Sequence, residues 1–334
     1  MGGEKVRLGA IGVGHWAGVL AKGVEKSGAA AIIRCYARTG ESRRAFGEKF
    51  GCRPADSLDE LLRDGAVEGV IISTPHSTHV DLIQQAASAG KHVFVEKPLA
   101  LAVEDGKRAT RACEQVGVVL MVGHHRRRLG ATRGIRRMLD AGELGMLHQL
   151  EGQVCNWNAQ RKRAGWRNDP KEWPAGGLTG RGVHIVDNLI YLAGPVRRVM
   201  AFSKRLLGAN ALDDVTAIAL EHDSGPLSYI GVSMVVPWRI STAAFGTRAS
   251  AWSEQDGAKL YFQKVGEETR TELPVETGDP FAEEISEFAR CIRGGGRSET
   301  GGPEALEVVA VLEAVLASIR SGRAEEVADS RQQA

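Results

Sequence analysis

The stretch Val6-Arg7-Leu8-Gly9-Ala10-Ile11-Gly12-Val13-Gly14-His15-Trp16-Ala17 decides the fold of this chain. Its first six residues predict an apolar strand, which runs into a glycine turn that opens a helix. Gly12 permits the tight turn, Gly14 lets the backbone approach a pyrophosphate closely, and Ala17 is small enough for helix and strand to pack together. Because the start of a helix offers unpaired N–H groups and the positive end of its dipole, we expect a dinucleotide to bind here.

Length and composition narrow the class of protein. A chain of 334 residues exceeds the size at which one hydrophobic core usually stops growing, so we expect two domains. Lys and Arg number 43 against 41 Asp and Glu, and this net charge of +2 argues against nucleic acid or membrane as a general partner. The five cysteines lack CxxC spacing and Met1–Lys5 leads straight into the first strand, so we expect a cytoplasmic protein without disulfides.

The order of apolar runs predicts an α/β fold. Strand patterns alternate with helical patterns up to residue 122, which predicts a doubly wound parallel sheet, a Rossmann domain over residues 1–122. From Gly123 onward strand patterns follow one another with few helices between them. We therefore predict an α+β domain over residues 123–325, built on a largely antiparallel, open sheet. Because a soluble monomer rarely exposes a large apolar patch, the open face predicts a homodimer or homotetramer.

Three further segments carry a resemblance to a known family. They are Ser73-Thr74-Pro75-His76-Ser77-Thr78-His79, Glu96-Lys97-Pro98-Leu99, and Gly176-Gly177 through Gly182-Val183-His184-Ile185-Val186-Asp187. Together with the glycine turn they resemble the glucose-fructose oxidoreductase, inositol dehydrogenase and MocA (Gfo/Idh/MocA) family. The resemblance implies an NAD(P)-dependent dehydrogenase or reductase that acts on CH–OH groups of a sugar, a cyclitol or a related polyol.

The resemblance also implies the catalytic residues. Oxidation of a secondary alcohol sends a hydride to the nicotinamide and the hydroxyl proton to a base. The family pattern places Lys97 beside the substrate oxygen and makes His184 the proton acceptor. Lys97 follows a predicted strand directly, where open α/β sheets bind ligands, and burial there would lower the pKa of its amine. A surface lysine at a turn is the alternative, and the Lys97-Pro98 bond can be cis because X-Pro bonds reach that form cheaply.

His184 departs from the family pattern in its surroundings. The family has an aspartate four residues earlier on the same helix face, where this chain has Gly180. That aspartate would orient the imidazole and support its charge. Either another carboxylate or the lysine compensates, or the chemistry is altered; a capping or packing role is the further alternative for His184. We interpret Asp187 as a supporting or ribose-contacting residue.

The end of the second predicted strand bears on cofactor choice. An NAD enzyme normally keeps Asp or Glu there, yet none lies between Glu25 and Glu41, and Ala37-Arg38-Thr39 stands at the turn. Because Arg38 can pair with a 2′-phosphate, we expect NADP(H) to be preferred, with a solvated arginine and use of NAD(H) as the alternative. The cofactor-binding candidates are Gly12, Gly14, His15, Trp16, Ala17, Arg38, Thr39, Ser73, Thr74, Pro75, His76, His79, Glu96, Lys97 and Arg127.

A basic run, His124-His125-Arg126-Arg127-Arg128, follows the last strand of the first domain. With Arg161, Lys162, Arg163 and Arg167 it could bind a carboxylate or phosphate of the substrate, the alternative being solvated arginines. The adjacent histidines lack metal-ligand spacing, so no metal is expected. Among Trp157, Trp166, Trp173 and Trp238, only Trp166 beside Arg167 enters the predicted site. The substrate-binding candidates are Lys97, His125, Trp166, Arg167, Asp187 and His184.

We therefore predict an NADP-preferring oxidoreductase that acts on a small polyol or keto-sugar. Two alternatives remain: a relative with non-redox chemistry by transient oxidation, and a non-catalytic NADP(H)-sensing protein. The presence of both Lys97 and His184 counts against the sensor, because a binding protein needs neither.

Overall fold

The computed structural model describes residues 4–158, 165–208 and 211–329, and these form two compact units. The first unit contains residues 4–125 and 278–306, and the second contains the described residues of 126–277 and 307–329. The first unit therefore includes α8 (Pro280–Ile292), a helix that the sequence pattern assigns to the second domain.

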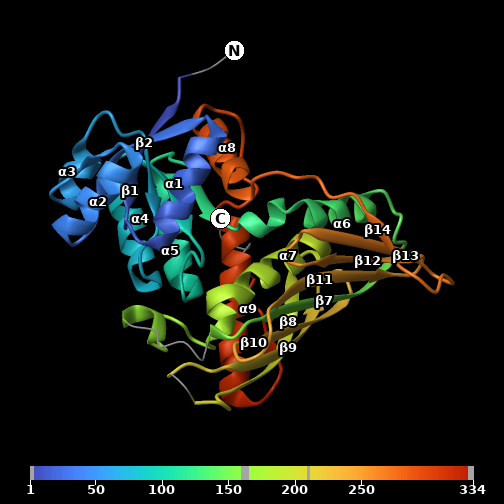
Figure 1. Cartoon of the computed structure of the whole chain (residues 1–334). Helices are drawn as coiled ribbons and strands as arrows, with labels where there is room; N and C mark the ends of the chain where they lie inside the picture. The colour runs from blue at the N-terminus through green and yellow to red at the C-terminus, as the bar shows by residue number, and fades with distance from the viewer. Residues whose placement is uncertain (1–3, 159–164, 209–210, 330–334) are drawn as a thin grey trace. The chain divides into compact units, whose positions relative to one another are not determined.

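Six parallel strands form the sheet of the first unit, in the order β3-β2-β1-β4-β5-β6. Figure 1 labels β1 and β2 of this sheet. They are β1 (Val6–Ile11), β2 (Ala30–Tyr36), β3 (Arg53–Pro54), β4 (Gly69–Ile72), β5 (His92–Glu96) and β6 (Leu120–Gly123). Since β1 pairs with β2 on one side and β4 on the other, the strand order reverses there. Doubly wound sheets bind ligands at the carboxyl ends of the strands beside such a reversal. The predicted Rossmann fold is confirmed.

Helices connect these strands, and α1 starts from the glycine turn. They are α1 (His15–Ser27), α2 (Gly40–Phe50), α3 (Leu58–Arg63), α4 (His79–Ser88) and α5 (Val103–Gln115). Gly12 has φ +83°, and a Cβ at this position would lie 2.8 Å from the carbonyl oxygen of Ser73. Only glycine suits both requirements, so the local sequence fixes the entry into α1.

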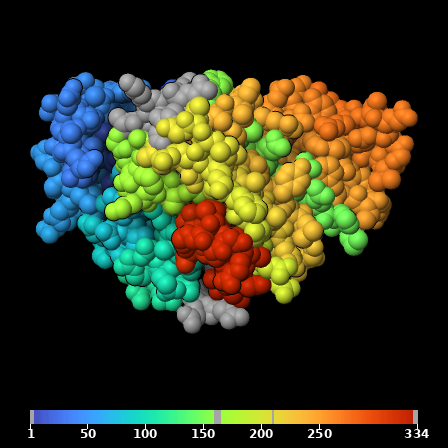
Figure 2. All heavy atoms as spheres, turned by 90° about the horizontal axis from the view of Figure 1, so that it is seen from below, coloured from blue at the N-terminus to red at the C-terminus, as the bar shows by residue number. Residues whose placement is uncertain are grey.

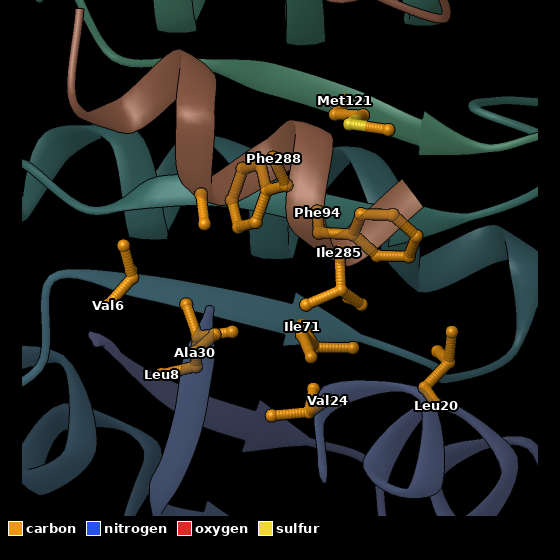
Figure 3. Packing of buried hydrophobic residues seen from close by; sticks show 11 residues of the cluster. Val6, Leu8, Leu20, Val24, Ala30, Ile71, Phe94, Met121, Ile285 and Phe288 are labelled. Atoms are coloured by element: carbon orange, nitrogen blue, oxygen red, sulfur yellow. The ribbon is translucent and has the colours of Figure 1, made fainter. Parts of the chain in front are cut away.

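The core of the first unit lies between the sheet, α1 and α8. In Figure 3 the side chains of Ile71 and Phe94 from the sheet lie close to Ile285 and Phe288 of α8. The Phe94 and Phe288 ring centroids are 5.8 Å apart in an edge-on arrangement. Burial of each such side chain stabilises the fold by about 1.5–3 kcal/mol. A helix from late in the chain thus completes this core.

A nine-stranded sheet forms the second unit, in the order β14-β13-β12-β11-β7-β10-β9-β8-β15. Only the β7–β10 pair is parallel among its described strand pairs, so the predicted mostly antiparallel sheet is confirmed. The strands are β7 (Leu147–Cys155), β8 (Val196–Lys204), β9 (Val215–His222), β10 (Leu227–Ser233), β11 (Arg239–Gly246), β12 (Ala249–Glu254), β13 (Lys259–Lys264), β14 (Thr271–Leu273) and β15 (Glu325–Glu326).

Helices α6 (Gly130–Asp140) and α7 (Val183–Ala193) contact one face of this sheet. Side chains on the other face are more exposed, as the alternation of buried and exposed residues along β9 and β10 shows. Phe202 on β8 is 60% exposed and Tyr229 on β10 is 39% exposed. After α9 (Gly302–Ser321), the last described residues lead to β15, which pairs with β8; Figure 2 shows this C-terminal segment, in red, at the surface.

Candidate active site

The glycine turn leaves the start of α1 open to a ligand. Gly14 is the N-cap of α1 and supplies no side-chain cap, and a Cβ placed on it would meet no atom within 4 Å. His15 beside it is exposed, whereas Ala17 is buried against the sheet. The first N–H groups of α1 therefore have no side-chain cap at an open surface, which suits a pyrophosphate.

Trp16 and His125, a predicted cofactor contact and a predicted substrate contact, lie in one aromatic cluster of the first unit. The His125 ring lies 4.4 Å from the Phe281 ring, and Trp16 lies 6.2 Å from Phe281 and 6.4 Å from His125, measured between centroids. Since Phe281 belongs to α8, the far end of the chain helps to hold both rings. The predicted contact of His125 with substrate stays a prediction.

The turn after β2 presents Arg38 and Thr39 at the surface. The Arg43 side chain also contacts this turn, because its Nη1 donates a 3.0 Å hydrogen bond to the Ala37 carbonyl oxygen. Thr39 Oγ1 donates to Ser42 Oγ at 2.7 Å. Arg38 is exposed and forms no ion pair with any residue that the structure describes. Its guanidinium therefore suits a phosphate at this edge of the sheet.

His79 links the segments that follow β4 and β5. This fully buried imidazole has Nδ1 2.9 Å from the Pro98 carbonyl oxygen and Nε2 3.2 Å from the Thr74 carbonyl oxygen. His76, also buried, packs edge-on against it. The Ser73 hydroxyl donates to the Gly12 carbonyl oxygen at 3.0 Å, which joins the same segment to the glycine turn. These predicted cofactor residues thus form one bonded framework, completed by Pro75 in the same loop.

Glu96 and Lys97 are both buried at the carboxyl end of β5. The surface-lysine interpretation of Lys97 is therefore wrong. Burial raises the pKa of Glu96 to about 7, against the opposing effect of the Lys97 charge. A carboxyl group that titrates near neutrality thus stands next to the predicted catalytic lysine. The Lys97-Pro98 peptide bond is cis.

In the second unit, His184 lies in the first turn of α7, and a short π-helix, η5 (Leu178–Gly182), precedes it. His184 is buried. A Cβ added to Gly180 would overlap the ring of Trp173. The indole thus occupies the space next to Gly180, and a side chain at this position would require the ring to shift. Inserted π-turns are frequent at functional sites.

Asp187, one turn after His184, is bound to Arg127. The Arg127 Nε lies 2.9 Å from each carboxylate oxygen, and its Nη2 donates to Oδ1 at 2.7 Å. The Asp187 side chain is 0% exposed, and the Arg127 guanidinium also stacks over Tyr191. This ion pair suits the supporting role predicted for Asp187, and its predicted contact with ribose or substrate stays a prediction.

The basic run does not form a solvated face. All of His124, His125, Arg126, Arg127 and Arg128 are buried, and Arg126 forms an ion pair with Asp256. The alternative of solvated arginines is therefore wrong for this run. Arg161, Lys162 and Arg163 lie outside the described residues.

Two arginines of the second unit stack on tryptophans. The Arg167 guanidinium lies 4.4 Å from the Trp166 ring centroid, and that ring lies 6.3 Å from the Trp173 ring. Arg181 in η5 lies 4.6 Å from the ring centroid of Trp238. Burial lowers the pKa of both guanidinium groups. The sequence analysis missed Arg181, whose nearness to His184 in the chain was the available signal, and it named Trp173 but left it out of the predicted site.

Metal and membrane features can be checked on the described part of the chain. Across residues 4–158, 165–208 and 211–329, no three His, Cys, Asp or Glu side chains gather as a metal site would require. Within the same ranges, no helix combines the length and apolar character needed to span a bilayer.

Sequence profiles of known families match both units. The profile described as GFO/IDH/MocA oxidoreductase family, NAD-binding Rossmann fold, matches residues 6–124. The GFO/IDH/MocA C-terminal domain profile matches residues 132–252. The two profiles therefore account for most of the chain.

Individual relatives include enzymes of sugars and cyclitols. D-apiose dehydrogenase of Paraburkholderia graminis is 29% identical over 90% of this chain and 84% of its own length. The NAD⁺-dependent scyllo-inositol 2-dehydrogenase of Bacillus subtilis is 28% identical over 87% of each chain. A solved structure from Desulfitobacterium hafniense, provisionally described as an NADPH-dependent oxidoreductase, is 31% identical with a TM-score of 0.93, over 97% of this chain and 98% of that one. The matches with two other curated relatives span 50% and 63% of those proteins.

Proposed function

Because the chain belongs to the GFO/IDH/MocA oxidoreductase family, we propose that it transfers hydride between a nicotinamide cofactor and a CH–OH group of a sugar, cyclitol or related polyol. The observation that carries the proposal is the buried Lys97 at the carboxyl end of β5, in the same unit as the open N-terminus of α1. An amine and a phosphate-binding turn at the same end of a doubly wound sheet suit a dinucleotide-dependent reaction.

The chain's own residues divide the chemistry. A bound nicotinamide supplies the hydride acceptor in oxidation and the donor in reduction. The Nζ of Lys97 binds the substrate oxygen and takes or returns its proton, and His184 is the second proton carrier. Because Trp173 excludes a side chain at position 180, His184 lacks the family's orienting aspartate. We therefore assign most of the proton transfer to Lys97.

NADP(H) is the proposed cofactor. The exposed Arg38 without an ion-pair partner in the described chain, and the absence of Asp or Glu between Glu25 and Glu41, support this choice over NAD(H). A guanidinium binds a 2′-phosphate through two parallel hydrogen bonds, and no carboxylate at this turn opposes the phosphate charge.

A screen of polyols and keto-sugars with each of the four nicotinamide cofactors tests the proposed function. We expect a change in the nicotinamide absorbance band with at least one substrate. Consumption of a substrate without net change of cofactor would favour transient oxidation instead. Transient oxidation is the second candidate function, because Gly180, beside the Trp173 ring, stands where the family has the aspartate that orients the histidine. Tight cofactor binding with neither outcome would support the sensor.

A further inference from the structure

We propose that the substrate carries an anionic group, a carboxylate or a phosphate, and that Arg181 binds it. The inference rests on the proposed function, because it names the class of polyol on which that function acts. The sequence analysis assigned binding of a substrate carboxylate or phosphate to the basic run and Arg167. We now assign it to Arg181, which the family pattern did not single out.

The position of Arg181 is the first argument. It belongs to η5, directly after Gly180 and three residues before His184. Its guanidinium is half-buried and stacks on Trp238 at 4.6 Å. Residues three or four apart on a helix are neighbours on its surface, so Arg181 lies close to His184, the proposed second proton carrier.

The charge of Arg181 is the second argument. Two buried arginines of the same unit have carboxylate partners: Arg126 pairs with Asp256 and Arg127 with Asp187. Arg181 has no such partner in the part of the chain that the structure describes. Burial lowers its pKa, and its charge in turn lowers the pKa of Arg126, whose own burial is the larger cause. A guanidinium that has lost water without gaining a counter-charge favours an anionic ligand.

The aromatic surroundings are the third argument. The flat face of the Arg181 guanidinium packs on the Trp238 ring, so the N–H groups at the edge of the guanidinium can donate hydrogen bonds to a ligand. Trp173 fills the space beside Gly180 and continues to Trp166, on which Arg167 stacks. Arg167 likewise has no carboxylate partner among the described residues, and it is the natural second contact for an extended anion. Indole faces also suit the C–H groups of a sugar ring.

Binding of matched ligand pairs tests the proposal. We would titrate the NADP⁺-loaded protein by calorimetry with aldonates, uronates and aldose phosphates, each beside its neutral parent polyol or sugar. At least one acid should bind 10-fold or more tightly than its parent, and that preference should shrink with added salt. The carboxylate and phosphate series distinguish the two anions. If no acid binds better than its parent, the proposal is wrong.

Variants locate the contact. Arg181→Gln should weaken binding of the preferred acid by about 10- to 100-fold and leave the parent's affinity unchanged, since a charge-assisted fork is lost. Arg181→Lys should recover part of the loss. Arg205→Gln, which removes an exposed arginine of the same unit, is the matched control and should have no effect. Thermal unfolding checks that each variant is folded. Unchanged acid binding by a folded Arg181→Gln variant would refute the inference.

Failure of the inference is distinguishable from failure of the proposed function. Turnover of neutral polyols by the unmodified protein, with no acid bound more tightly than its parent, would leave hydride transfer in place and overturn the anionic substrate. Tight, Arg181-dependent binding of an acid without hydride transfer on any substrate would do the reverse.

Discussion

Lys97 and His184 differ in the side chains that surround them. Lys97 is buried next to Glu96, whose pKa burial raises to about 7, at the end of a strand that fixes its position. His184 is buried at the start of α7, and the indole of Trp173 takes the place of a carboxylate one turn earlier. The proposed chemistry therefore depends more on the lysine than on the histidine.

Lys97→Met tests this assignment, because methionine keeps much of the length and apolar volume of lysine while it removes the ammonium group. We expect turnover to fall by about 100-fold or more with cofactor affinity retained. His184→Asn should lower turnover by less. Steady-state kinetics on the best substrate from the screen, beside cofactor titration, provide the comparison. Near-normal turnover of a folded Lys97→Met variant would contradict the mechanism.

Arg38→Ala tests cofactor choice. Loss of the contact with the 2′-phosphate should weaken NADPH binding by about 1.5–3 kcal/mol and leave NADH binding nearly unchanged. Arg63→Ala, which removes an exposed arginine of the same unit, is the control and should alter neither affinity. Calorimetric titration with both cofactors decides. Equal losses, or tighter binding of NADH by the unmodified protein, would refute the assignment.

At the scale of elements, the junction of η5 and α7 has a built-in constraint. The chain passes from η5 into α7 so closely to Trp173 that a side chain at position 180 would overlap the Trp173 ring unless that ring moved. On the first unit, the carboxyl end of β5 is constrained in another way, because it holds the Glu96 carboxyl group away from water. Substitutions at Gly180 and Glu96 should therefore change the stability of the protein, although the sequence motif alone gives no reason to expect this.

Restoring the family's aspartate should damage this protein. Gly180→Asp places a side chain where the Trp173 ring lies, and we expect a loss of about 1–3 kcal/mol in the free energy of unfolding. The double variant Gly180→Asp with Trp173→Ala should be less affected by the aspartate, since the ring is gone. Urea unfolding measures both. Gly65→Asp, at a glycine with no neighbour within 4 Å of a Cβ, is the control.

Glu96 should make stability depend on pH. Its folded pKa of about 7 exceeds the usual value of 4.5, so the folded state binds the additional proton between these values. The unfolding free energy should therefore fall as pH rises from about 4.5 to about 7, by up to about 3 kcal/mol, and then level off. Glu96→Gln should remove this part of the dependence. If the unfolding free energies of the unmodified protein and Glu96→Gln differ by the same amount at about pH 4.5 and at about pH 7, the assignment is wrong.

At the scale of the whole molecule, one face of the second unit's sheet carries exposed apolar side chains. Phe202, Leu227 and Tyr229 are all exposed there, on strands β8 and β10. Soluble monomers rarely keep large apolar patches in contact with water. The sheet is therefore the surface through which we expect copies of this chain to associate.

Light scattering after size exclusion tests this expectation. We predict a homodimer or homotetramer at micromolar concentration. Ala219→Arg should dissociate it, because the residue opposite Tyr229 in β9 would then carry a charge into the interface. Ser77→Arg, at an exposed position on the first unit, is the control. A monomer of the unmodified protein would refute the prediction.

Local patterns in the sequence determined the architecture. The glycine turn, the alternation of strands and helices, and the late strand patterns are short-range features, because turn geometry and side-chain periodicity act within a few residues. They predicted the Rossmann sheet, the mostly antiparallel second sheet and the placement of Lys97 after a strand.

Tertiary structure alone decided how the side chains of the candidate site are used. Asp187 binds Arg127, which is 60 residues away, and α8 joins the core of the first unit from the far end of the chain. The burial of the basic run and the ring of Trp173 at Gly180 depend likewise on packing between segments apart in sequence. Such contacts depend on volume and distance in the folded chain, which no local pattern encodes.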